Sequence, residues 1–151
     1  MMVWGGRSLL KVLIADDEIN IILLIKSLID RKKTAVEIIG EAGDGITALE
    51  MVRRLKPDVV ITDIRMPGMS GMDLIRHVRE EQIPVEFVII SGYSEFEYAR
   101  SAIQYGVSDY LLKPIKQAEL METLEKIREK CESRLETMEP SAGSIRTAKR
   151  I

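Results

Sequence analysis

Short apolar runs alternate with longer amphipathic segments five times along the chain, and this alternation restricts the fold more than any other feature. The runs lack the alternating polar residues of a strand with one face in solvent. In the longer segments, apolar residues recur at spacings of three and four, as on a helix face. The pattern predicts an α/β fold with a parallel sheet covered by helices on both faces. The predicted strands are 9–15, 35–42, 58–63, 84–91 and 109–113, and the predicted helices are 18–31, 46–56, 71–80, 94–106 and 116–138.

Polar residues mark where several of these helices begin. Ser70 followed by Asp73, and Ser94 followed by Glu97, resemble capping boxes, in which two side chains satisfy backbone N–H groups at a helix start. Asp17 lies directly before the first helix and is placed to cap it. These residues predict where the first, third and fourth helices start.

The first and last helices carry more apolar surface than covering a sheet requires. The first is apolar over more than one face, so part of it is expected to be exposed or paired. The last is long enough either to fray in solvent or to continue as a dimer-forming linker helix, and both alternatives stay open. Its apolar stripe consists of Leu120, Leu124, Ile127, Cys131, Leu135 and Met138.

Composition limits the class of protein and the partners it can bind. The 151 residues are 46% hydrophobic, which suffices for one packed domain with a short extension. The formal net charge is −2, so the chain has no overall attraction for nucleic acid or an anionic membrane. One cysteine, no secretory signal and no bilayer-length apolar stretch favour a cytoplasmic location.

Acidic and polar residues follow four of the predicted strands at the point where each strand ends. Asp16 and Asp17 follow the first strand, Asp63 ends the third, Ser91 the fourth and Lys113 the fifth. In an open parallel sheet, binding sites form at the carboxyl ends of the strands where the strand order reverses. If the strand order is 2-1-3-4-5, the first and third strands are neighbours, and three carboxylates should then meet in one crevice.

Three close carboxylates require a compensating charge, and a divalent cation is the natural candidate. Oxygen ligands suit Mg²⁺, which typically takes one or two carboxylates together with water and phosphate oxygens. Such a site suits phosphoryl transfer, in which a metal and a lysine offset the charge of the transferring group. A carboxylate can itself accept the phosphoryl group as an aspartyl phosphate.

Each of these residues also has a simpler interpretation. An acid after a strand is often a helix cap, which suits Asp17 about as well as a metal ligand does. Asp63 and Ser91 both precede turn sequences, and most lysines, such as Lys113, are solvated. The simpler interpretations are each adequate alone, but they do not account for the joint placement at successive strand ends.

The arrangement resembles the receiver domain of two-component response regulators. The resemblance covers most of the chain, and the piece Asp-x-x-Met-Pro-x-x-x-Gly after a strand is specific to it. The stretch 92–110 looks most like receivers fused to AraC-type helix-turn-helix output domains. The matching pieces are Asp16-Asp-Glu18, Asp63-Ile-Arg-Met-Pro-Gly-Met-Ser-Gly-Met-Asp73, Ser91-Gly92 and Asp109-Tyr-Leu-Leu-Lys-Pro114.

The resemblance implies a flavodoxin-like (βα)5 fold with strand order 2-1-3-4-5 and a set of site residues. Asp63 would be the phosphoacceptor. Asp16, Asp17, Asp63 and the backbone carbonyl of Arg65 would hold Mg²⁺. These are expectations for this chain, each at the position that matches the family motif.

Further expectations concern the groups around the phosphoryl site. Ser91 would hydrogen-bond the phosphoryl group, and Lys113 would pair with its oxygens, with the Lys113–Pro114 peptide bond in cis. Tyr110 would swing inward as Ser91 moves, unless it is only a half-buried strand residue. Bulky Tyr93 would obstruct attacking water, so at most weak self-dephosphorylation is expected.

The resemblance also implies partners and boundaries. A sensor histidine kinase would donate the phosphoryl group, and the surface of the fourth helix, fifth strand and fifth helix would respond to control transcription, with homodimerisation through this surface as one route. The domain itself would bind neither nucleic acid nor a membrane. The expected layout is an N-terminal extension, 1–8, a receiver, 9–137, and a tail or start of a linker to an output domain, 138–151.

Three rival hypotheses belong to other classes. An α/β phosphatase with an aspartate nucleophile needs a second catalytic acid or a capping insertion near Asp63, and the loop after Asp63 offers neither. A flavin-binding module needs a hydroxyl- and glycine-rich loop after the first strand, where two acids stand instead. A degenerate receiver would not keep the full set Asp16, Asp17, Asp63, Ser91 and Lys113.

Overall fold

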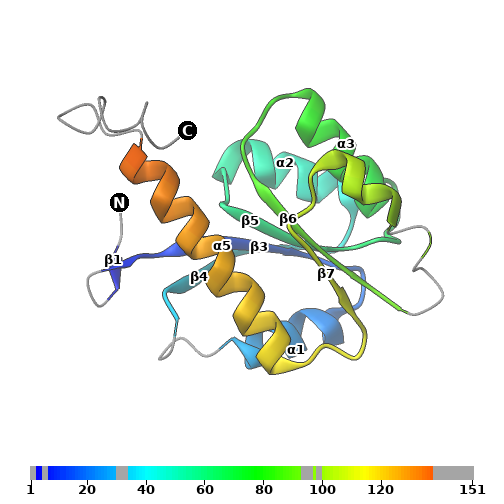
Figure 1. Ribbon diagram of the computed structural model, residues 1–151. Helices are drawn as coiled ribbons and strands as arrows, with labels where there is room; N and C mark the ends of the chain where they lie inside the picture. Colours follow the sequence, from blue (N-terminus) through cyan, green and yellow to red (C-terminus); the bar gives the residue numbers. More distant parts are fainter. Residues whose placement is uncertain (1–2, 5–6, 30–33, 93–96, 98–99, 138–151) are drawn as a thin grey trace.

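A five-stranded parallel sheet forms the centre of the molecule (Figure 1). The computed structural model describes residues 3–4, 7–29, 34–92, 97 and 100–137. Counted along the sequence, the strands of this sheet lie in order 2-1-3-4-5, so the predicted flavodoxin-like topology is confirmed. The strands, in spatial order, are β4 (Val36–Ala42), β3 (Leu10–Ala15), β5 (Val59–Asp63), β6 (Glu86–Ser91) and β7 (Asp109–Leu112).

Helices cover both faces of the sheet, as predicted (Figure 1). Alternate residues of β3 point to opposite faces: Val12 and Ile14 pack on one side, Leu13 and Ala15 on the other. This explains why the strand is apolar throughout. The first side is covered by α1 (Ile19–Leu28) and α5 (Gln117–Thr137), and the second by α2 (Gly45–Leu55), α3 (Gly71–Glu80) and the 3₁₀ turn η2 (Ser101–Tyr105).

The helix starts follow local capping chemistry, with one correction. Ser70 caps α3, its hydroxyl accepting from the Asp73 N–H at 3.1 Å. The prediction that Asp17 caps α1 is wrong, because Glu18 occupies the N-cap position and makes no side-chain cap bond. Asp16 instead accepts the Glu18 N–H through Oδ1 at 2.9 Å, which turns the chain into the helix and leaves the Asp17 side chain for the site.

Element ends differ modestly from the predicted ranges. Helix α1 ends at Leu28, because Ile29 is extended; the rest of the predicted 18–31 segment lies outside the described residues. Of the predicted fourth helix, 94–106, the structure describes residue 97 and residues 100–106, and the capping residue Ser94 lies outside the described part. A short antiparallel pair, β1 (Val3–Trp4) and β2 (Arg7–Ser8), was not predicted, because two-residue strands leave no periodic pattern.

Helix α1 carries the exposed apolar surface that its composition predicts. Ile19 and Leu23 are 59% and 53% exposed, whereas Ile22 and Ile25 are buried against the sheet. Among the described residues, no helix has both the length and the apolarity needed to cross a membrane.

Candidate functional site

The strand order brings the predicted site residues to one edge of the sheet. Ala15 of β3 pairs with Thr62 of β5, so Asp16 and Asp63 follow paired positions on neighbouring strands. β6 continues the same edge with Ser91, and Lys113 follows β7. This edge is where the strand order reverses, the usual place for a ligand site in such a sheet.

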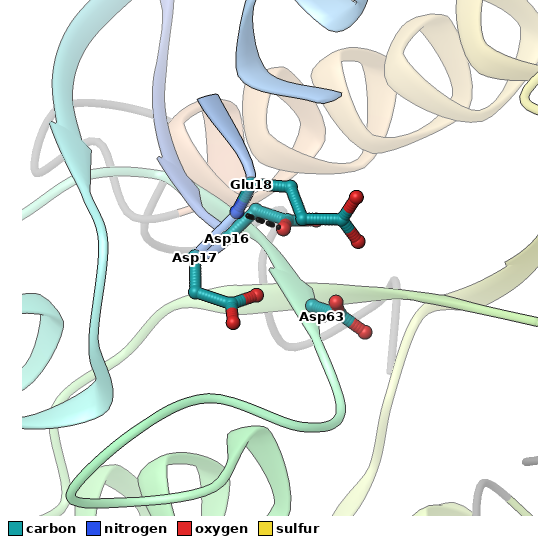
Figure 2. A group of neighbouring side chains, drawn as sticks. All are labelled: Asp16, Asp17, Glu18 and Asp63. Atoms are coloured by element: carbon teal, nitrogen blue, oxygen red, sulfur yellow. Dashed lines mark hydrogen bonds between the residues drawn. The ribbon is translucent and has the colours of Figure 1, made fainter. Parts of the chain in front are cut away.

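Four acidic side chains converge at this edge (Figure 2). Carboxylate oxygens of Asp16, Asp17, Glu18 and Asp63 lie within 4.8 Å of one another, a set that could hold a metal ion. Asp16 and Asp63 are buried, whereas Asp17 and Glu18 are exposed. Glu18 was not predicted as a member of the cluster, although its place directly after two site acids could have suggested it.

Asp16 is the member whose environment departs most from that of an ordinary carboxylate. It is 1% exposed, and its Oδ2 atom is buried without a hydrogen bond from any described residue. Burial raises the pKa of Asp16 to about 6, and the neighbouring charge of Asp63 adds to this increase. A cation stabilises a buried carboxylate that has no donor on one oxygen, so the residues present fit a divalent ion.

Lys113 supplies part of the missing positive charge. Its ammonium group lies 3.2 Å from Asp63 Oδ2, 3.8 Å from Asp16 Oδ2 and 3.7 Å from Glu18 Oε1. Burial alone would lower the pKa of Lys113, but the carboxylates of Asp63, Asp16 and Glu18 together outweigh it and the pKa is raised. The Lys113–Pro114 peptide bond is cis, as expected. One lysine thus faces three of the four acids, and the cluster keeps a net negative charge.

Asp63 is held by the backbone that follows it. Its Oδ1 accepts the Ile64 N–H at 2.7 Å, and its Oδ2 is the atom nearest the ammonium of Lys113. Gly71, at the start of α3, donates its N–H to the Ile64 carbonyl at 2.7 Å. A β-carbon at Gly71 would lie 2.1 Å from the Asp63 carbonyl oxygen, so only glycine allows this close approach.

Ser91 and Tyr110 are already in contact. Ser91 is fully buried at the end of β6, and its hydroxyl donates to the Tyr110 hydroxyl at 2.7 Å. The two residues lie on adjacent strands, as predicted, because β6 pairs with β7. Arg65 is exposed in the loop two residues after Asp63, and Tyr93 lies outside the described residues.

Comparison with known proteins identifies the family that this architecture matches. Residues 12–125 match the family described as "Response regulator receiver domain". The chain is 41% identical over 117 residues to the uncharacterized transcriptional regulatory protein YesN of Bacillus subtilis, covering 78% of this chain and 32% of that protein. It is 40% identical over 110 residues to the transcriptional regulatory protein HptR of Staphylococcus aureus, covering 73% of this chain and 43% of that protein. The chain therefore spans less than half the length of these curated relatives.

Solved structures show the same architecture. The REC domain of AraT, a response regulator from Geobacillus stearothermophilus, superposes with a TM-score of 0.79 at 42% identity, covering 84% of this chain and 98% of that one. The signal receiver domain of the putative response regulator NarL from Mycobacterium tuberculosis superposes with a TM-score of 0.74 at 29% identity, covering 81% of this chain and 98% of that one. The resemblance predicted from the sequence, including that to receivers of AraC-type regulators, is confirmed by these matches.

Proposed function

The chain belongs to the response regulator receiver domain family, and on that premise we propose that Asp63 accepts a phosphoryl group in a Mg²⁺-dependent reaction. The observation that carries the proposal is the buried Asp16 Oδ2, which has no hydrogen bond from the described residues and lies in a cluster that includes Asp63. Such an atom is expected where a cation is to bind. The same cluster contains the acceptor, and the ammonium of Lys113 lies 3.2 Å from Asp63 Oδ2.

Three of the four acids have a role in the proposed reaction. Asp16, Asp17, Asp63 and the carbonyl of Arg65 would hold Mg²⁺, which when bound offsets negative charge on the transferring oxygens. An oxygen of Asp63 forms the new P–O bond as the donor's P–N bond breaks, and the departing imidazole nitrogen keeps the electron pair and takes up a proton.

Two further residues stabilise the product. Lys113 is already 3.2 Å from Asp63 Oδ2, so its ammonium can pair with a phosphoryl oxygen after a small movement. The Ser91 hydroxyl donates to Tyr110 in the unmodified protein, and it would turn toward the phosphoryl group instead. Tyr110 then loses this hydrogen bond and would swing inward, which is the proposed switch.

The phosphoryl donor we propose is a sensor histidine kinase. Ile19 and Leu23 are exposed apolar residues on α1, and this helix begins directly after the acids of the site. A donor protein that packs on these two residues would therefore bring its phosphohistidine close to Asp63. Self-dephosphorylation would be weak at most, so the domain would act as a switch.

The output we propose is transcriptional control through the surface formed by the fourth helix, β7 and α5, with homodimerisation as one route. The named relatives are transcriptional regulatory proteins and are longer than this chain, which supports an output domain after a receiver at residues 9–137. In that arrangement residues 138–151 would begin the linker, and residues 1–8 would be an N-terminal extension. The receiver itself would contact neither DNA nor a membrane, and the protein would act in the cytoplasm.

Labelling with a small phosphodonor tests the proposal. The chain is incubated with acetyl phosphate and Mg²⁺, and the phosphorylated fraction is measured by intact mass and by phosphate-affinity electrophoresis. The wild type should be labelled, whereas Asp63→Asn and an EDTA-treated sample should not. Asp58→Asn is the matched control, because Asp58 directly precedes the opposite end of β5 and its side chain accepts the Lys11 N–H at 2.8 Å. Labelling that persists in Asp63→Asn would refute the assignment.

A further inference from the structure

The loop that follows Asp63 is held from the side by the first turn of α2. The Gly45 N–H, in this first turn, donates to the Pro67 carbonyl at 3.4 Å, and the same carbonyl accepts from the Met69 N–H at 2.8 Å. The carbonyl of Arg65, a proposed Mg²⁺ ligand, lies within this loop. Residues 64–70 are therefore fixed at two places: at Gly71, beside Asp63, and at Gly45.

Gly45 is in closer contact with the loop than any side chain would permit. A β-carbon at Gly45 would lie 2.0 Å from the Met69 carbonyl oxygen and 2.6 Å from the Met69 β-carbon. Both atoms belong to or adjoin the backbone, so they cannot turn away as the end of a flexible side chain would. By contrast, a β-carbon at Gly43, two residues earlier, would have no neighbour within 4 Å.

Ile46 holds the loop next to this contact. Its side chain is 52% exposed, yet its Cδ1 atom would lie 3.2 Å from a β-carbon at Gly68. Gly68 has a φ of 77°, a conformation that favours glycine, so the tip of the loop is a tight turn under Ile46. The turn of α2 that presents both residues is itself fixed, because Asp44 accepts the Thr47 N–H at 2.7 Å.

We propose that Gly45 and Ile46 are positioning residues for the phosphoacceptor site. They hold the loop 64–70 in the position from which the Arg65 carbonyl can bind Mg²⁺ together with the acids. This inference rests on the proposed function. Neither residue touches the phosphoryl group or the metal, and both act through the loop. Groups that orient a metal ligand typically change metal affinity by 10- to 100-fold when altered, without being ligands themselves.

The first test compares two glycine substitutions that differ in available space. Mg²⁺ affinity is measured by isothermal titration calorimetry at a temperature where thermal unfolding shows each variant to be folded. Gly45→Ala should weaken Mg²⁺ binding by roughly 10-fold, whereas Gly43→Ala should bind as the wild type does. A purely structural role for Gly45 would lower the melting temperature and leave the affinity of the folded protein unchanged, which would overturn the proposal.

The second test uses two exposed apolar residues and does not depend on Gly45→Ala folding. Ile46→Ala should weaken Mg²⁺ binding by roughly 2- to 3-fold and slow acetyl phosphate labelling of Asp63 in proportion, because a loosened loop populates the competent geometry less often. Leu24→Ala removes another exposed apolar side chain, on α1, and should change neither quantity. Equal affinities for wild type and Ile46→Ala would contradict the inference.

The outcomes separate this inference from the proposed function. If the wild type binds no Mg²⁺ or Asp63→Asn is still labelled, the proposed function fails. If the wild type binds Mg²⁺ and is labelled at Asp63, while Gly45→Ala and Ile46→Ala match it, only the positioning role fails.

Discussion

The two oxygens of the Asp16 carboxylate have different surroundings, and the difference indicates what the residue is for. Oδ1 accepts the Glu18 N–H at 2.9 Å and helps to start α1, whereas Oδ2 is buried without a hydrogen bond from the described residues. If the side chain were needed only to accept the Glu18 N–H in this turn, one oxygen would be enough and asparagine could provide it. The charge on Asp16 therefore reduces the stability of the metal-free domain.

Replacing Asp16 by Asn should stabilise the domain in EDTA. Asp16 has a folded-state pKa of about 6 against its ordinary value of 3.8, so at pH 7 its ionised form opposes folding. A shift of this size corresponds to roughly 2 to 3 kcal/mol, and Asn keeps the oxygen that accepts from Glu18. Chemical denaturation at pH 7 should show a higher free energy of unfolding for Asp16→Asn than for the wild type.

Adding Mg²⁺ should reverse that order. Mg²⁺ should raise the free energy of unfolding of the wild type, because it binds only the folded protein, and should leave Asp16→Asn almost unchanged. Asp58→Asn is again the control at the other end of the sheet. An Asp16→Asn protein that is less stable than the wild type in EDTA would show that the buried charge is compensated in some other way.

At the scale of elements, the strands were predictable because they are buried on both faces. The start of α1 was not predictable from the sequence, because it lies among exposed polar residues. β5 is buried at every position, so its continuous apolar run indicated both its type and its end at Asp63. The cap of α1 was mispredicted because Asp16, Asp17 and Glu18 can each start a helix, and only the tertiary site decides which carboxylate turns inward. The contact of Gly45 with Met69 could not be predicted either, since it joins segments from different elements.

Helix α1 offers a direct test of its two faces. Ile22 is 4% exposed and packs on the sheet, whereas its neighbour Leu23 is 53% exposed. Ile22→Ala should lower the free energy of unfolding by about 3 kcal/mol, because it leaves a cavity in the core. Leu23→Ala should change it by less than about 0.5 kcal/mol, as for surface positions generally.

Urea denaturation of the two variants measures this difference. A large loss in Leu23→Ala would mean that another part of the chain covers the outer face of α1, and the face would then not be available to a phosphodonor protein. A small decrease in the free energy of unfolding of Leu23→Ala would show that this apolar face is exposed, as the proposed docking requires.

At the scale of the whole molecule, the site occupies one end of the sheet and an ionic cluster occupies the other. Glu86 opens β6, the strand that ends at Ser91, and is 6% exposed. Its carboxylate accepts from the Ser108 hydroxyl at 2.6 Å, from Lys130 at 2.9 Å and from Arg134 at 2.7 Å. A single acid thus ties the start of β6 and the approach to β7 to the far half of α5. The sequence pattern did not indicate it, since Glu86 interrupts an otherwise apolar strand.

This cluster should make the domain sensitive to acid in a defined window. Burial alone would raise the pKa of Glu86, but the hydrogen bonds from Ser108, Lys130 and Arg134 outweigh it and lower the pKa to about 2. Because the folded-state pKa lies below the ordinary value of 4.5 for glutamate, the stabilisation is fully present above pH 4.5 and is lost as the pH falls toward 2. Allowing for the half-exposed cations, it amounts to roughly 2 kcal/mol.

The difference between the wild type and Glu86→Gln isolates this contribution from the other carboxylates. The free energy of unfolding, measured by urea denaturation from pH 6 to pH 2.5, should be higher for the wild type at pH 6, and the gap should narrow steadily below pH 4.5. Glu81→Gln is the matched control, since Glu81 also pairs with an arginine, Arg53, but on the surface. A gap that stays constant across this range would mean that Glu86 acts through packing alone. A narrowing gap would show that its charge holds α5 to the sheet, at the end of the molecule from which a following domain would extend.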